Sequence, residues 1–154
     1  MKTRLDPGEL AICKHVGRMR SVIARNAGVR DAKVGSHDGA EADEQGMIAE
    51  YAFAKLFNVF PDFGLSPRSG SADGICKGKR YDVKSTKHKS GRLLATLKNN
   101  PDVDIYVLAI VDGAEVSFPG WAYKDELMNE RNIKDLGRGK GYALEQRELR
   151  KFKG

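Results

Sequence analysis

Apolar residues near the start of the chain recur at helical spacing, three or four residues apart. The segment Asp6-Pro7-Gly8-Glu9 precedes them and has the pattern of an N-cap, a proline at the first helical position and a capping box. Gly28 is a typical helix end. We therefore predict a helix over about 6–27 whose apolar stripe is Ile12, Val16, Met19 and Ile23 and whose solvent face is Lys14, Arg18, Ser21 and Arg25.

A second helix is predicted over about 43–57, where Met47, Tyr51, Ala54 and Phe57 share one side. Glu50 falls within the same arc, so its carboxylate faces the expected core. Burying an unpaired charge costs several kcal/mol. We expect Glu50 to have a cationic partner or to bind a metal ion, and an acid at the helix edge with a basic neighbour is the alternative.

The middle of the chain has the pattern of strands. Residues of about 72–77 and 80–86 flank Lys77-Gly78, which suits the two-residue turn of a β-hairpin. A further strand is predicted over 92–97, and the nearly continuous apolar run 103–111 is typical of a central strand covered on both faces. A strand at 116–118 and a short helix over 121–129 follow, whereas 142–152 fits a strand, a helix or one after the other.

Composition fits one folded domain spanning 1–154, with 40% hydrophobic and 31% charged residues. No apolar run approaches the roughly 20 residues that span a bilayer, so we expect no membrane partner. Two cysteines, Cys13 and Cys76, cannot form a dense disulfide framework, and a cytoplasmic location is expected. The net charge of +6 favours a polyanionic partner.

The predicted hairpin concentrates charged groups on one face. Side chains alternate along a strand, so Asp82 and Lys84 point the same way, and a turn at Lys77-Gly78 places Asp73 opposite Asp82. Opposed like charges are destabilising unless a cation lies between them. The pattern therefore predicts a metal site, although a solvated ion pair for Asp82 and Lys84 and an Asp-Gly turn for Asp73 explain each residue taken alone.

The order of these charged residues resembles the signature of the PD-(D/E)XK nuclease superfamily, and in particular that of small phage-type endonucleases within it. The matching residues are Glu50 on a helix, then Asp73, then Asp82-Val83-Lys84. Ala72-Asp73 stands where the family pattern has Pro-Asp. The resemblance covers roughly 46–111 and implies an α/β fold with a restriction-endonuclease-like core, a mixed β-sheet flanked by helices. We expect the single domain to consist of the N-terminal helix, a catalytic core of about 43–120 and a basic C-terminal segment of about 130–154.

The resemblance also implies the chemistry. Mg²⁺ or Mn²⁺ would be bound by Asp73, Asp82 and the main-chain carbonyl of Val83, with Glu50 binding directly, through water or at a second metal. Lys84 would orient or activate the attacking water. The catalytic residues are therefore Glu50, Asp73, Asp82 and Lys84, and the reaction is hydrolysis of phosphodiester bonds.

Basic residues after the catalytic strand, Lys87, Lys89, Arg92 and Lys98, are candidates for binding DNA phosphates. The expected function is a DNA endonuclease in phage or mobile-element DNA processing. A Holliday-junction resolvase, an exonuclease and a nicking enzyme of the same superfamily are alternatives, and so is a basic DNA-binding module without catalysis. Whether the protein forms a homodimer stays open.

Overall fold

The computed structural model describes residues 1–26, 39–65, 72–98, 100–137 and 139–153. The expected helix end at Gly28 lies outside these ranges. The helices are α1 (Pro7–Asn26), α2 (Gly39–Phe57) and α3 (Lys124–Leu127), with 3₁₀ turns at Glu130–Asn132 and Gln146–Glu148. The strands are β1 (Lys2–Arg4), β2 (Gly74–Cys76), β3 (Lys79–Thr86), β4 (Leu93–Thr96), β5 (Ile105–Asp112), β6 (Glu115–Tyr123), β7 (Ile133–Asp135) and β8 (Lys140–Leu144).

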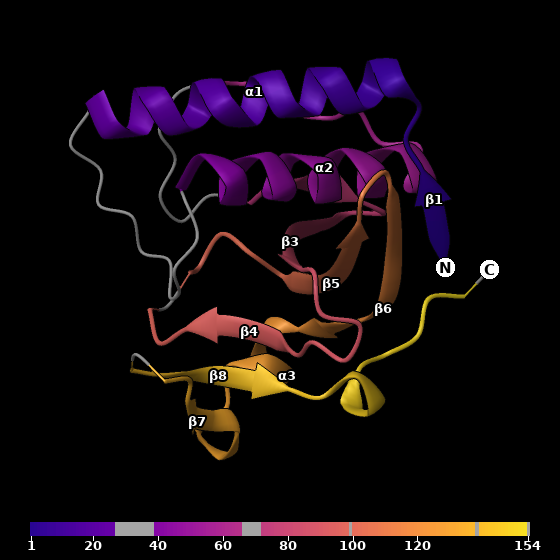
Figure 1. Ribbon diagram of the computed structural model, residues 1–154. Helices are drawn as coiled ribbons and strands as arrows, with labels where there is room; N and C mark the ends of the chain where they lie inside the picture. The colour runs from indigo at the N-terminus through magenta and orange to yellow at the C-terminus, as the bar shows by residue number, and fades with distance from the viewer. Residues whose placement is uncertain (27–38, 66–71, 99, 138, 154) are drawn as a thin grey trace.

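The strands form two sheets in an α/β arrangement (Figure 1). The larger sheet has the order β1-β6-β5-β3-β2, with β3 and β5 parallel and the other neighbours antiparallel. The smaller sheet has the order β4-β8-β7. Strand β5 is the middle strand of the larger sheet and is buried over seven of its eight residues, which confirms the predicted central strand.

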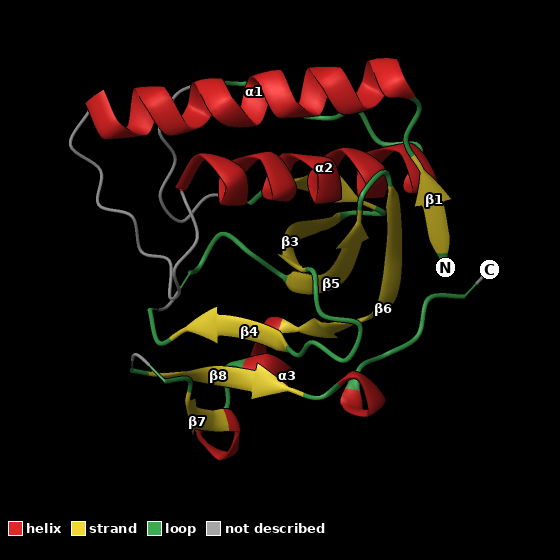
Figure 2. Cartoon of the chain, in the orientation of Figure 1, coloured by secondary structure: helices red, strands yellow, loops and turns green. Residues whose placement is uncertain are grey.

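The two long helices lie on the same side of the larger sheet, with α2 between α1 and the strands (Figure 2). The smaller sheet lies on the opposite side. The α/β class with a mixed sheet is therefore confirmed, but the long helices cover one face instead of flanking both. The interior is accordingly divided into a core between α2 and the larger sheet and a second core between the sheets.

The predicted start of the first helix is confirmed. The backbone N–H of Asp6 donates to the Glu9 carboxylate at 2.8 Å, and the N–H of Glu9 donates to the Asp6 carboxylate at 2.8 Å. Lys55 of α2 lies 2.7 Å from Glu9 and so ties the capping box to the second helix. The second helix begins at Gly39, four residues earlier than expected.

The predicted apolar stripe of α1 is wrong in part. Ile12 is 49% exposed, whereas Ser21, expected on the solvent face, is 3% exposed. A Cβ on Gly17 would lie 2.6 Å from Cα of Glu44, so the two helices pack too closely for large side chains. The face of α1 that meets α2 is therefore lined by small and medium residues, Cys13, Val16, Gly17 and Ser21, which hydrophobicity alone does not identify.

The predicted hairpin is confirmed, including its register. Cys76 pairs with Lys79 and Gly74 with Tyr81, so Lys77 and Gly78 form the two-residue turn. Both turn residues have positive φ, 50° and 77°, as a type I′ turn requires. The N–H of Asp73 donates to the Tyr81 carbonyl at 2.8 Å and extends the ladder one step beyond β2.

Later elements depart from expectation in one place. The strand predicted over 92–97 is β4, but the helix predicted over 121–129 is only the single turn α3. Trp121 belongs to β6, where it pairs with Val107 and also forms a backbone bridge with Arg150. This extra pairing holds 121–123 extended. The segment 142–152 contains the end of β8 followed by a 3₁₀ turn.

Candidate active site

The side chains of β3 alternate between the two cores. Tyr81 packs on Phe53 of α2 with ring centroids 4.4 Å apart, and Ser85 accepts a 3.1 Å hydrogen bond from Gln45 of the same helix. Asp82 and Lys84 point to the other side, where the Lys84 ammonium lies 5.9 Å from the ring centroid of Tyr106. Asp82 and Lys84 are thus neighbours on one face, at the side where the smaller sheet packs.

Asp73 lies at the open edge of β3, just where β2 ends. Its carboxylate accepts a 2.7 Å hydrogen bond from the N–H of Val83, which lies beyond the residue pairs that join β2 to β3. The carboxylate therefore continues the hydrogen bonding along this edge past the end of β2. Because the N–H and C=O of a strand residue point the same way, the Val83 carbonyl faces this edge as well.

Glu50 approaches the same edge from α2. Its carboxylate is hydrogen-bonded to Asp73 and accepts a 2.9 Å charged hydrogen bond from Arg20 of α1. The Arg20 guanidinium also donates to the carbonyls of Gly64 at 2.8 Å and Asp62 at 2.6 Å. Arg20 is thus the cationic partner that half-buried Glu50 requires, and it fixes Glu50 to the segment after α2.

Burial, together with the negative charges of Glu50 and Asp82, raises the pKa of Asp73 well above its usual range. The hydrogen bond with Glu50 adds to this effect, and the Val83 N–H opposes it. A hydrogen bond between two carboxyl groups needs one proton. The raised pKa of Asp73 favours the protonated form of this carboxyl group, which can then donate to Glu50. The acidic groups at this edge of the sheet therefore cannot all be negatively charged unless a cation lies among them.

Asp82 is 9% exposed and has Lys84 as its partner, with Nζ 3.0 Å from Oδ2. The Lys84 side chain is itself 42% exposed, so the ammonium reaches solvent while remaining beside the acid. Burial, and secondarily the charge of Asp82, raises the pKa of neighbouring Tyr106 to about 12. Tyr106 therefore stays neutral and forms an apolar wall under the pair.

The residues proposed from sequence as metal ligands thus lie in one interacting cluster, but not as a completed ligand set. In the described ranges, no group of three or more His, Cys, Asp or Glu side chains is arranged to hold a metal ion. Arg20 and Lys84 each bind one of the outer acids, Glu50 and Asp82. The donors are hard carboxylate oxygens with unbalanced negative charge, which in chemical terms suits Mg²⁺ or Mn²⁺.

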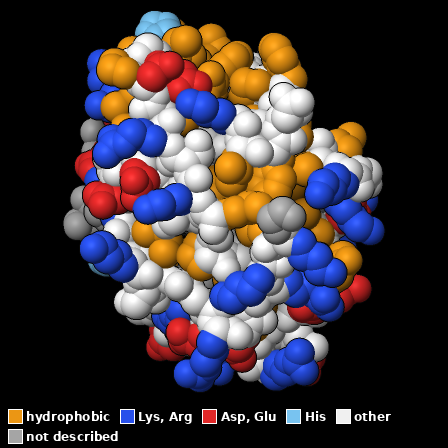
Figure 3. Space-filling model, turned by 90° about the vertical axis from the view of Figure 1, so that its right-hand side faces the viewer, with side chains coloured by type: hydrophobic (Ala, Val, Ile, Leu, Met, Phe, Trp, Pro, Cys, Tyr) orange, Lys and Arg blue, Asp and Glu red, His pale blue; other side chains and the backbone are white. Residues whose placement is uncertain are grey.

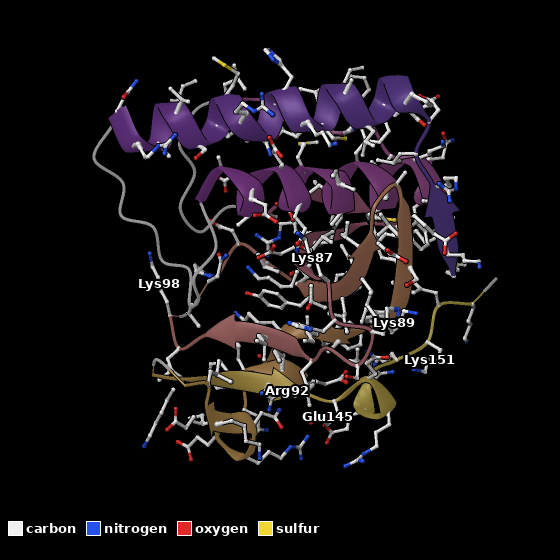
Figure 4. The ribbon with its side chains drawn as sticks, in the orientation of Figure 1. Lys87, Lys89, Arg92, Lys98, Glu145 and Lys151 are labelled. Atoms are coloured by element: carbon white, nitrogen blue, oxygen red, sulfur yellow. The ribbon has the colours of Figure 1, made fainter. Side chains whose placement is uncertain are left out.

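A cleft of about 670 Å³ opens beside Lys84, between β3 and β4. Its walls are Lys84, Ser85, Thr86, His88, Ser90, Gly91, Arg92, Leu94, Leu108 and Glu145. Figure 4 labels two of these residues, Arg92 and Glu145, and also Lys98, which lies just beyond the end of β4. Of the four predicted DNA-binding residues, only Arg92 lines the cleft; Lys87 pairs with Glu41 of α2 instead.

Positive charge is spread widely over the surface. On the side that carries both chain ends, Lys and Arg side chains are scattered between uncharged and hydrophobic surface, with acidic side chains in small groups (Figure 3). The net charge of +6 therefore does not by itself mark a binding site. The position of a basic residue relative to the acidic cluster is the more informative property.

Sequence patterns did not identify Arg20 or Gln146 as contributors to this region. Arg20 follows Val16 by four residues, and this spacing places it on the buried face of α1. Gln146 donates to the carbonyls of Lys89 and Gly91 and so fixes the turn beside the cleft. No local signal marks Gln146, because its partners lie more than fifty residues earlier.

No helix in the described ranges is long and apolar enough to cross a membrane. Comparison of the chain with protein-family models, with curated proteins and with solved structures finds no match.

Proposed function

We propose that the chain is a divalent-metal-dependent DNA endonuclease with the restriction-endonuclease-like core of the PD-(D/E)XK superfamily, acting in phage or mobile-element DNA processing. The observation that carries the proposal is that Asp73, at a sheet edge, interacts with two other acids, one of which pairs with a lysine. Asp73 interacts with Glu50 and Asp82, and Asp82 pairs with Lys84 at 3.0 Å. A purely structural arrangement of this kind is unfavourable, because it buries like charges together.

In the proposed reaction, Asp73, Asp82 and the Val83 carbonyl would hold the metal ion, and Glu50 would support it. When bound, Mg²⁺ or Mn²⁺ would lower the pKa of a water molecule and balance charge on the phosphate. Arg20 would orient Glu50 through its 2.9 Å hydrogen bond. The Lys84 ammonium, half-exposed beside Asp82, orients the attacking water and stabilises the negative charge that develops on the phosphate.

The test is DNA cleavage by the wild type and by Lys84→Ala. We expect cleavage in Mg²⁺ or Mn²⁺, none in chelator, and a loss of about 10²–10³-fold in Lys84→Ala with DNA binding retained. Lys79→Ala, at the other end of β3, is the matched control and should cleave like the wild type. Linear, nicked, branched and single-stranded substrates tested together separate endonuclease, resolvase and exonuclease activities.

The second candidate, a DNA-binding module without catalysis, is favoured by the net charge of +6 alone. It predicts metal-independent binding, with no strand cleavage of any substrate in any metal. Equal cleavage by the wild type and Lys84→Ala would contradict the role assigned to the lysine.

A further inference from the structure

We infer that the cleft beside Lys84 binds a single unpaired strand of DNA, and that the preferred substrate therefore carries a single-stranded segment next to the cleaved bond. This inference rests on the proposed nuclease function and adds a substrate class to it. Lys84 joins the two regions, because it pairs with Asp82 and also lines the cleft. A DNA strand bound in the cleft would place one of its phosphates beside the acidic cluster.

The size of the cleft favours one strand over two. A volume of about 670 Å³ lies in the range of pockets that enclose a small molecule, and a nucleotide is a ligand of that size. The space is bounded by β3 and β5 on one side and β4 on the other, with Leu108 and Leu94 contributed by these opposite walls. A DNA duplex is wider than a single strand and could contact only the rim of this cleft.

Arg92 is the basic residue best placed to bind a phosphate in the cleft. Its side chain is half-buried, and no ion pair links it to any residue within the described ranges. In contrast, Lys84 and Lys87 both have acidic partners. A guanidinium that is partly withdrawn from water without an anion is available for an anionic ligand, and phosphate matches its two-pronged geometry.

The cleft also offers apolar contact for a base. Leu94 is 37% exposed although it lies in β4, and buried Leu108 is also part of the lining. Single-strand binding proteins combine an apolar, usually aromatic, surface for bases with positive charge for the backbone. Glu145, the acid of the cleft lining, repels phosphate but accepts hydrogen bonds from base amino groups, so it favours a strand with its bases on that side.

The turn that closes the cleft is rigidly held. Gln146 donates to the carbonyls of Lys89 and Gly91 at 2.8 and 2.9 Å, and the Gly91 N–H donates to the His88 carbonyl at 2.9 Å. A Cβ on Gly91 would lie 2.5 Å from the Thr86 methyl group, so the turn packs directly on β3. The cleft is therefore formed before a ligand binds, which reduces the entropic cost of binding.

The first experiment measures binding in chelator, where cleavage cannot interfere. Fluorescence anisotropy would compare a labelled oligo-dT strand with a blunt duplex of equal length. We expect the wild type to bind the single strand more tightly, and Arg92→Ala to weaken that binding roughly tenfold while changing duplex binding less. Arg131→Ala, an exposed arginine outside the cleft, is the matched control and should change neither affinity by more than about twofold.

Two substitutions of Leu94, measured with the same single-stranded and duplex DNA, give an independent test. Leu94→Ala should weaken single-strand binding, and Leu94→Phe should retain it, because an aromatic ring preserves the surface for a base. Equal binding of strand and duplex, or an equal effect of Arg92→Ala on both, would overturn the inference. So would a loss of affinity in Arg131→Ala as large as in Arg92→Ala.

Cleavage in Mg²⁺ separates this inference from the proposed function. We expect a duplex with a single-stranded arm to be cut faster than its blunt counterpart, with the advantage lost in Arg92→Ala. Equal cutting of both substrates by the wild type would overturn the cleft assignment and leave the nuclease proposal intact. Cleft-dependent strand binding without cleavage of any DNA would overturn the nuclease proposal and support the cleft assignment.

Discussion

Asp73 carries an unfavourable set of interactions for a residue with a structural role. Its side chain is half-buried, it receives one backbone hydrogen bond from Val83, and it faces the charges of Glu50 and Asp82. An asparagine at this position could accept the same hydrogen bond without the charge. Proteins often keep such unfavourable groups at functional sites, where stability is lower than the fold allows. The carboxylate of Asp73 therefore points to a ligand that makes its charge favourable.

For Asp73→Asn we predict a gain in stability together with a loss of function. In chelator, urea denaturation should show a free energy of unfolding higher by about 0.5–2 kcal/mol, the range of stabilising single substitutions. Cleavage should fall by at least about 10²-fold, because a charged metal ligand is lost. The exposed Asp112→Asn is the control and should change neither quantity measurably. A less stable Asp73→Asn would mean that the carboxylate serves the fold.

At the scale of elements, the contact between α1 and α2 depends on a glycine. A Cβ on Gly17 would lie 2.6 Å from Cα of Glu44 and 2.7 Å from the Asp43 carbonyl, and both are backbone atoms that cannot easily move. The same helix pair brings Arg20 to Glu50. The spacing of α1 and α2 therefore affects the candidate site as well as the core.

Gly17→Ala should accordingly destabilise the protein by about 1–3 kcal/mol, the usual cost of overpacking. Gly46→Ala in α2 is the matched control, because its Cβ would meet nothing within 4 Å. The control should raise stability by about 0.5–1 kcal/mol through helix propensity alone. Thermal denaturation of both variants measures the contrast, and similar shifts for the two would contradict the close helix contact.

Elements set by local chemistry were predictable, and those set by distant contacts were not. The capping box at Asp6 and Glu9 and the turn at Lys77-Gly78 depend on residues within a few positions, so sequence alone identifies them. The burial of Ser21 depends on the approach of α2, and the extended backbone at Trp121 depends on pairing with Arg150 near the chain end. Neither partner can be recognised from local sequence.

The same distinction applies to the candidate site. The hairpin register relates Asp73 to Asp82, and strand alternation relates Asp82 to Lys84, so these neighbours follow from short-range rules. Glu50 could be placed on the inner side of its helix, but not at a particular edge of the sheet. The hydrogen bonds from Arg20 to Glu50 and to Gly64 arise only when three segments pack together, and no sequence period contains them.

At the scale of the whole molecule, different acidic groups change the stability of the fold in opposite directions as the pH changes. The Asp6 N–H and, secondarily, Lys55 lower the pKa of Glu9 from its ordinary value of 4.5 to about 2. Hydrogen bonds from Arg80 lower the pKa of Asp104 from 3.8 to about 2. These groups stabilise the fold above pH 4 to 5, and their contribution is lost as the pH falls towards 2. Protonation of these two groups therefore lowers the stability of the protein in acid.

Asp73 acts in the opposite direction, because its pKa in the folded protein lies above the ordinary 3.8. Between these two pKa values the folded state binds more protons than the unfolded state, so stability falls as the pH rises through that window. In chelator we therefore predict a wild-type denaturation midpoint that declines, as the pH rises above the ordinary pKa of 3.8, more than that of Asp73→Asn.

Mg²⁺ should reduce this decline in the wild type, because a cation bound only by the folded state stabilises it and favours the charged carboxylate. Asp73→Asn should respond much less to the metal. Thermal denaturation at several pH values, with chelator and with Mg²⁺, measures both effects in one series. Parallel curves for the two proteins in both conditions would mean that Asp73 neither holds the excess proton nor exchanges it for a metal ion.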